Sequence, residues 1–231
     1  MRTIKKVASH IFIDGFGGMT QGLFATLIIG TMIQQIGLLI GGSTGNVIYL
    51  LGKAAAALTS AGIGVGVAVK YGESPLVTVS AAVAAMVGGY AGKITGGTFF
   101  VDGNAVLAGP GEPLGAFIAA FAGITCGHLV SGKTKVDIIV TPVITIGAGS
   151  VVGLLVGPPI SQMMTGLGSI INWATEQRPF IMGIVVSVVM GMVLTLPISS
   201  AALGIILNLS GLAAGAATIG CCLLYTSPSP R

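Results

Sequence analysis

The uncharged run MTQGLFATLIIGTMIQQIGLLIG, residues 19–41, indicates the fold class of this chain. An α-helix needs roughly 20 apolar residues to cross the hydrocarbon core of a bilayer, and this run exceeds that length. It does not alternate apolar and polar residues as a strand of a membrane barrel does. The run begins past Asp14 and contains no small-residue cleavage site, so it predicts a retained first membrane helix and not a signal peptide.

The rest of the chain has the same apolar character. Of its 231 residues, 53% are hydrophobic and 7% are charged, and the mean hydropathy is +1.00. Apolar segments lie at residues 19–41, 47–69, 75–91, 113–130, 137–156 and 180–197, with another from about 200. We therefore predict an all-α, polytopic helical membrane protein with about seven transmembrane segments. A formal charge of +4 is too thinly spread to indicate a nucleic-acid partner.

Glycine is unusually frequent, with 38 residues. Small residues four positions apart lie on one face of a helix and allow two helix backbones to approach closely. Such spacing recurs at Gly62/Gly66, Gly88/Gly92, Gly123/Gly127, Gly149/Gly153/Gly157 and Gly211/Gly215. We interpret these glycines as helix-packing residues.

The lysines and arginines predict how the helices are oriented. They collect at Arg2/Lys5/Lys6, Lys70 and Lys133/Lys135, at alternate ends of the predicted spans. Short loops rich in Lys and Arg usually face the cytoplasm, so these loops and the N-terminus are predicted to lie inside. Lys53 and Lys93 lie near the opposite ends and weaken this asymmetry.

Two regions are too polar, or too rich in Gly and Pro, to face lipid. Residues 92–112 are expected to form a re-entrant or an external loop. In residues 157–179, the sequence Gly157-Pro158-Pro159 is expected to end a helix, and Trp173 suits a position at the membrane interface.

All three glutamates stand just before a proline that opens an apolar segment: Glu73, Glu112 and Glu176. Proline suits the first helical turn, and an acid there is stabilised by the helix dipole, which accounts for Glu73. Glu112 and Glu176 border the two irregular regions, where broken transporter helices gather substrate contacts. A carboxylate can accept hydrogen bonds from two sugar hydroxyls, so these two residues are candidate substrate ligands, with helix capping as the alternative.

Other reactive residues suggest no catalytic, metal or cofactor site. Cys126 and Cys221 lie inside apolar runs, and His10 and His128 lack metal-ligand spacing. The sequence GHLVSGKT, residues 127–134, matches the phosphate-loop pattern, but it follows an apolar helix and not a strand, so nucleotide binding is rejected.

The last ten residues, CLLYTSPSPR at 222–231, break an apolar helix abruptly. They can be back-translated into a string that resembles a transposon-end sequencing adapter. We therefore expect one membrane domain over residues 1–221, truncated at its C-terminus, followed by a foreign tail over 222–231.

Four stretches together resemble the bacterial phosphotransferase system (PTS) enzyme IIC family, in the branch that includes perfringolysin-regulator-like membrane proteins. They are FIDG at 12–15, GPGEPLGAF at 109–117, SGKTKVDI at 131–138 and LPISSAA at 196–202. The resemblance extends over residues 1–221.

This resemblance implies a multi-pass permease of the bacterial cytoplasmic membrane that binds and translocates a sugar. Phosphoryl transfer would come from EIIB and EIIA proteins in trans, since neither module is visible here and Cys126 is embedded in an apolar run. A homodimer fits the resemblance. The run Gly109–Pro113 looks like the family's substrate-binding glutamate-proline motif and again selects Glu112. The alternatives are a membrane sensor that binds a ligand without transporting it and, ranked last, an ion-coupled transporter.

Overall fold

The computed structural model describes residues 14–101, 104–107, 109–175, 183–188 and 191–192. The chain divides into two compact units, Met1–Ser161 and Gln162–Arg231, and the boundary falls inside a long helix. The predicted segment from about 200 and the tail at 222–231 lie outside the described residues.

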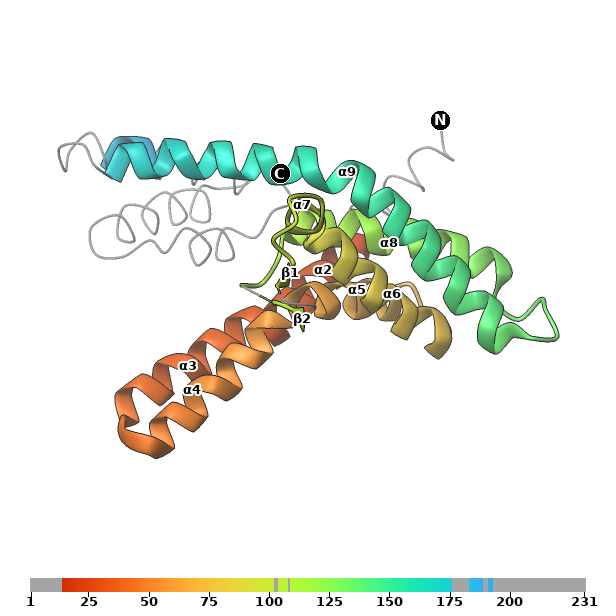
Figure 1. Cartoon of the computed structure of the whole chain (residues 1–231), viewed down its shortest axis with the longest axis horizontal. Helices are drawn as coiled ribbons and strands as arrows, with labels where there is room; N and C mark the ends of the chain where they lie inside the picture. Colours follow the sequence, from red (N-terminus) through yellow and green to blue (C-terminus); the bar gives the residue numbers. More distant parts are fainter. Residues whose placement is uncertain (1–13, 102–103, 108, 176–182, 189–190, 193–231) are drawn as a thin grey trace, which may run out of the picture. The chain divides into compact units, whose positions relative to one another are not determined.

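The first unit begins with a long apolar helix that folds back on itself. Helices α2 (Phe16–Leu23), η2 (Phe24–Ile28, a π-helical turn) and α3 (Ile29–Ile40) form one apolar segment of 25 residues. Gly41 and Gly42, both with positive φ, turn the chain into α4 (Gly42–Ala57). After Leu58 the chain continues as α5 (Thr59–Lys70), bent by 53° from α4. Figure 1 shows α3 and α4 lying side by side.

Glycines allow these helices to touch through their backbones. A Cβ atom added to Gly18 of α2 would lie 2.6 Å from the carbonyl oxygen of Gly66 in α5. On α3, a Cβ atom at Gly30 would lie 2.9 Å from the carbonyl oxygen of Gly52 in α4. The packing role predicted for the glycines is therefore confirmed for Gly62/Gly66 and the other described pairs, while Gly211/Gly215 lie outside the described residues.

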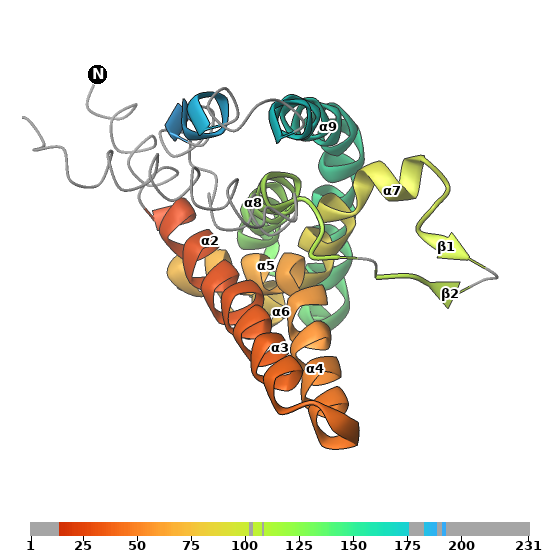
Figure 2. The same cartoon turned by 90° about the vertical axis from the view of Figure 1, so that its left-hand side faces the viewer.

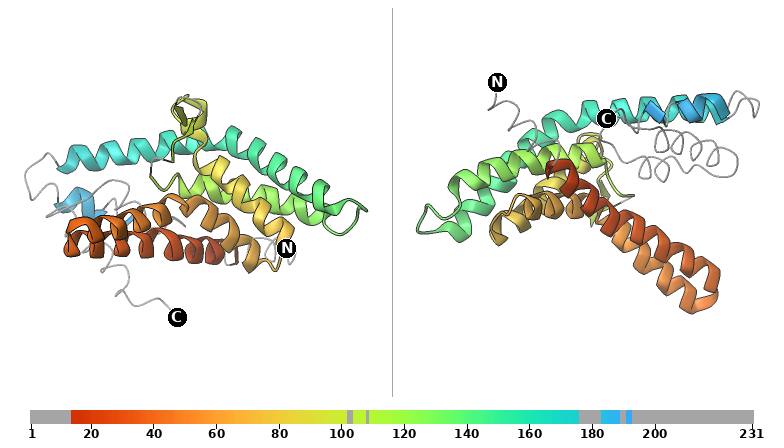
Figure 3. Two further views of the ribbon diagram at one scale, coloured as in Figure 1. Left: turned by 60° about the horizontal axis from the view of Figure 1, so that its bottom comes forward. Right: turned by 180° about the vertical axis from the view of Figure 1, so that it is seen from behind.

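The remaining helices of this unit are α6 (Pro75–Gly89), α8 (Pro113–Val130) and the first part of α9 (Asp137–Thr175). Helix α6 packs on both α5 and α8, as the left view of Figure 3 helps to follow. A Cβ atom at Gly149 of α9 would lie 2.7 Å from the carbonyl oxygen of Ala119 in α8. The core of the unit is thus a set of closely packed helices lined with small residues.

Residues between α6 and α8 form the irregular region that the sequence predicts. It contains the short helix α7 (Ala91–Thr95) and two strands, β1 (Phe100–Val101) and β2 (Asn104–Ala105). The strands pair antiparallel, with Phe100 opposite Ala105, and form the small hairpin seen in Figure 2.

The number of membrane-spanning helices in the described residues is smaller than the seven segments predicted from the sequence. Three described helices are long and apolar enough to cross a membrane, or up to four if the bent α4–α5 pair is one span. Helix α6, with 15 residues, is about 22 Å long and shorter than the hydrocarbon core. An all-α membrane protein is confirmed, and seven spans remain a prediction because residues 176–182 and 193–231 lie outside the described part.

The expectation that Gly157-Pro158-Pro159 ends a helix is wrong. Helix α9 continues through Pro142, Pro158 and Pro159 as far as Thr175, so the predicted segment 137–156 is too short. Proline removes a backbone hydrogen bond, at a cost of about 3 kcal/mol in water, but neighbouring helices and side chains can satisfy the freed groups in a membrane protein. Of the predicted segment 180–197, residues 183–188 and 191–192 are helical in the described part.

Candidate functional site

The segment Gly109–Pro113 lies where α5, α6 and α8 meet. Gly109 and Gly111 have φ of 80° and 75°, a conformation that side chains disfavour and that explains both glycines. Glu112 is extended, with φ −85° and ψ 112°, and Pro113 opens α8 in the first helical turn. The local sequence therefore dictates a tight turn that delivers Glu112 directly to the start of a helix.

Three hydrogen bonds fix this segment to the surrounding helices. The buried Ser60 hydroxyl on α5 donates to the carbonyl oxygen of Pro110 at 3.0 Å. The Tyr90 hydroxyl at the end of α6 bonds the carbonyl oxygen of Gly109 and lies 3.3 Å from that of Ala57 in α4. The Glu112 backbone N–H donates to the carbonyl oxygen of Gly89 at 2.7 Å.

Tyr90 also links this segment to the break between α4 and α5. Its side chain is 1% exposed, so its hydroxyl needs partners inside the protein. Ala57 is the last residue of α4, where carbonyl groups lose their helical partners. The bent α4–α5 pair and the turn before Glu112 are therefore held by one buried side chain.

The Glu112 side chain accepts no capping hydrogen bond from α8, although Glu112 is the N-cap residue. Burial raises the pKa of the Glu112 carboxyl, and the nearby positive charge of Lys93 partly offsets this. The N-terminal ends of α5 and α8, which carry positive partial charge, both adjoin the Gly109–Pro113 segment. Chemically, the carboxylate can accept hydrogen bonds from a polar ligand.

Aromatic rings lie beside the site, next to the irregular region between α6 and α8. The Tyr90 ring lies 5.4 Å, centroid to centroid, from that of Phe99, which precedes the hairpin. The ammonium of Lys93 on α7 lies 5.4 Å from the centroid of the Tyr90 ring. The site therefore combines a carboxylate, a cation and aromatic surface.

The other predicted residues have different outcomes. Glu176 lies outside the described residues, directly after α9 ends at Thr175. The irregular backbone expected before Glu176 is helical, which removes part of the argument for that residue. Glu73 does not cap α6, because Ser74 is the N-cap residue and Glu73 instead contacts His128 at the end of α8.

Ser60, Tyr90 and Lys93 were not identified from the sequence as site residues. Ser60 and Lys93 lie 52 and 19 positions before Glu112, and only the bend between α4 and α5 and the turn after α6 bring them close. The sequence Gly109-Pro110-Gly111 predicts a tight turn before Glu112, but it does not indicate which residues hold that turn.

The region 127–134 has no phosphate-loop geometry. Gly127–Val130 form the last turn of α8, and the backbone N–H of Gly132 donates to Asp137 Oδ1 at 3.0 Å. A phosphate loop needs free backbone N–H groups at the start of a helix, whereas these residues end one.

A family model described as "Phosphotransferase system, EIIC" matches residues 13–226. This match spans all the helices described above, including the Glu112 segment. No curated protein and no solved structure matches the chain.

Proposed function

The chain belongs to the phosphotransferase system EIIC family, and on this premise we propose that Glu112 is its principal sugar ligand. The family and the apolar helices make the chain an integral membrane protein and a permease component of a sugar phosphotransferase system. Sugar, membrane and EIIB and EIIA proteins are the partners that this family implies in general. The specific sugar and the binding residues belong to the proposal.

One observation carries the proposal: the Glu112 carboxylate is held partly buried, at a junction of helices, without a capping hydrogen bond. Desolvating a carboxylate costs several kcal/mol, and a cap would return part of that cost. Two hydroxyls of a sugar can supply the missing hydrogen bonds. The three backbone anchors around Gly109–Pro113 hold the acid ready for that contact.

Transport then requires the site to open alternately to each side of the membrane. We propose that the bent α4–α5 pair takes part, because Tyr90 and Ser60 tie the Glu112 segment to both halves of that pair. Discontinuous helices that border a substrate site are typical of transporters. Phosphoryl transfer to the sugar is assigned to an EIIB protein in trans.

Glu176 is retained as a second proposed sugar contact, on its sequence position alone. A Glu176→Gln variant should weaken sugar binding less than the same change at Glu112. An equal or larger loss at Glu176 would reverse the assignment of the principal ligand.

The proposed orientation places the N-terminus and the loops at Lys70 and Lys133/Lys135 in the cytoplasm of a bacterial cell. Contacts within the first unit support placing the start of α2 and the loop after Lys70 on the same side of the membrane. A Cβ atom at Gly15 would lie 2.6 Å from the Tyr71 hydroxyl, and one at Gly17 would lie 3.8 Å from Lys70 Cε. A cysteine introduced at Lys133 should react with a membrane-impermeant maleimide only in inverted vesicles. Labelling in right-side-out vesicles alone would reverse the topology.

Uptake of labelled sugars into membrane vesicles tests the function. With EIIA and EIIB proteins present, sugar should accumulate as its phosphate only when phosphoenolpyruvate is supplied. Binding without accumulation would favour the sensor alternative, and uptake without the phosphoryl donor would favour ion coupling. A homodimer is also proposed, and the mass of the protein in detergent measured by light scattering tests it.

A further inference from the structure

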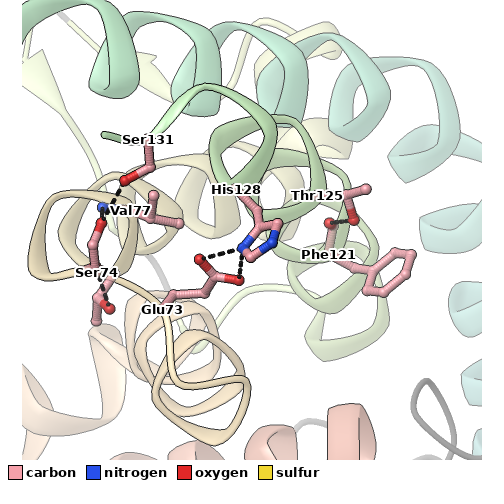
Figure 4. Close-up of polar contacts among 8 residues, drawn as sticks. Glu73, Ser74, Val77, Phe121, Thr125, His128 and Ser131 are labelled. Carbon is pink, nitrogen blue, oxygen red and sulfur yellow. Dashed lines mark hydrogen bonds and ion pairs between the residues drawn. The ribbon is translucent and has the colours of Figure 1, made fainter. Parts of the chain in front are cut away.

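A second polar cluster lies at the end of α8 opposite to Glu112 (Figure 4). His128 is in the last turn of α8, and Glu73 is in the turn between α5 and α6. The Nδ1 atom of His128 lies 3.0 Å from Glu73 Oε1 and 3.2 Å from Oε2. Beside this pair, the hydroxyl oxygens of Ser74 and Ser131 are 3.1 Å apart. Two side-chain contacts thus join the start of α6 to the end of α8.

The two members of the ionisable pair differ in their access to water. The side chain of His128 is 71% exposed, whereas that of Glu73 is 10% exposed. Because Nδ1 faces the carboxylate, Nε2 is the nitrogen that can exchange a proton with solvent. Histidine is the side chain whose charge ordinarily changes between about pH 5 and 8.

Other titratable groups lie near this end of α8, and they interact with groups other than the Glu73–His128 pair. Asp137 Oδ1 accepts hydrogen bonds from the Gly132 backbone N–H at 3.0 Å and the Thr141 hydroxyl at 2.6 Å. Burial, and then the charge of Asp14, raise the pKa of Tyr71. In the described part of the chain, Glu73 is the acid within ion-pair distance of His128. The groups contributed by the surrounding elements are Asp14 before α2, Lys70 on α5, Tyr71 after it, Lys133 and Lys135 between α8 and α9, and Asp137 on α9.

Helices α6 and α8 are also joined at their other end, by the Gly109–Pro113 segment. There the Glu112 N–H donates to the Gly89 carbonyl oxygen, and a Cβ atom at Gly115 would lie 2.7 Å from the Gly88 carbonyl oxygen. Helices α6 and α8 are therefore packed backbone to backbone near Glu112 and bridged by side chains at the far end. The far end is the part that a change of side-chain charge can loosen.

We propose that the Glu73–His128 pair is a proton-binding site that latches the start of α6 to the end of α8. When a proton from water binds Nε2, the imidazolium and the Glu73 carboxylate attract each other as opposite charges. When that proton leaves, the neutral imidazole still donates one hydrogen bond from Nδ1 to the carboxylate, but the attraction between opposite charges is lost and the bridge weakens. The bridge between the start of α6 and the end of α8 is therefore stronger when His128 is charged than when it is neutral. The proposal does not depend on sugar binding by Glu112.

Amide hydrogen exchange of the purified protein in nanodiscs, followed by mass spectrometry, tests the latch. The variants are His128→Asn, which keeps a hydrogen-bond donor near Nδ1 but cannot titrate, and Glu73→Gln, which removes the carboxylate charge. Thr125→Val is the matched control, because this exposed residue on α8 bonds only the carbonyl oxygen of its own helix at Phe121. Comparing variants with the parent at one pH cancels the intrinsic pH dependence of exchange.

At about pH 5.5, peptides covering Glu73–Thr78 and Gly127–Lys133 should exchange roughly two- to fivefold more slowly in the parent than in either latch variant. At about pH 8 this difference should become smaller, because only the hydrogen bond between Nδ1 and the Glu73 carboxylate remains. Thr125→Val should follow the parent at both values, and peptides from α2 should be the same in all four proteins. Equal exchange in parent and variants at the lower pH, or a difference that persists unchanged at the higher pH, would overturn the proposal. If His128→Asn does not fold, Glu73→Gln alone decides between these outcomes.

Discussion

Replacing Glu112 by Gln should abolish most of the sugar affinity while leaving the fold intact. The side chain accepts no capping hydrogen bond, and its backbone bond to Gly89 does not depend on the carboxylate. Hydrogen bonds to a charged group contribute about 1.5–3 kcal/mol each. Glutamine loses the charge and replaces one acceptor by a donor, so a loss of about 2–4 kcal/mol is expected. That loss corresponds to a roughly 30- to 700-fold increase in Kd.

The assay is equilibrium binding of labelled sugars to the protein in nanodiscs, with the melting temperature measured on the same samples. Asp14→Asn serves as the matched control, since it makes the same change of chemistry in the turn before α2. Without sugar, the Gln variant should melt at the same temperature as the parent or higher, because it removes the cost of desolvating the carboxylate. A Gln variant that binds sugar with unchanged Kd would refute the ligand assignment, even if uptake were reduced.

The pH dependence of the same binding curve provides a further check. Burial raises the pKa of the Glu112 carboxyl, so protonation begins at a higher pH than for an exposed glutamate. Binding that requires the carboxylate should be complete above that pKa and should fall as pH decreases through it. The Gln variant should show no such decline.

Three other changes should have distinct effects. Gly111→Ala should destabilise the protein by more than about 1–2 kcal/mol, because the φ of Gly111 is positive and an added Cβ would collide with the buried Ser60 hydroxyl. Gly97→Ala is the control, since Gly97 also has a positive φ but has open space around it, and it should cost less. Thermal melting of the two variants compares these costs. Tyr90→Phe removes the single hydroxyl proton that the carbonyl oxygens of Gly109 and Ala57 share, and it should lose about 1–3 kcal/mol of stability and weaken sugar binding. Unchanged melting and Kd would contradict the anchoring role. Lys93→Met removes the charge that lowers the Glu112 pKa, so the decline of binding on acidification should move to higher pH, measured by the same titration.

Helix character was predictable from local sequence wherever the apolar run was long. The expected segment 113–130 coincides with α8, and 19–41 differs from the observed span, Phe16–Ile40, by three residues at its start and one at its end. Predictions from local sequence were wrong at two places: where a helix continues through prolines, and where a helix bends without a proline or glycine. Helix α9 passes Pro158 and Pro159 because packing in a membrane protein can satisfy the groups that proline frees. The α4–α5 bend falls at Leu58, where no proline or glycine marks it.

The candidate site was predictable only as a single residue. Glu112 stands out because an acid at the edge of an apolar segment is rare and costly. Its neighbours Ser60 and Tyr90 are ordinary residues of apolar helices, and nothing in their local sequence indicates that they hold the Gly109–Pro113 segment. The same holds for His128, whose partner Glu73 is 55 positions away.

The helical membrane character of this chain follows from local sequence, because apolar length and glycine spacing are properties of nearby residues that the bilayer selects directly. Local sequence also indicates which acid merits attention, since the cost of desolvating a carboxylate does not depend on the details of packing. Three facts came from the folded chain alone: Glu112 is left uncapped, three hydrogen bonds from α5 and the end of α6 anchor its turn, and Glu73 pairs with His128. These facts depend on which helices pack together, and that choice is made by contacts between residues far apart in the chain.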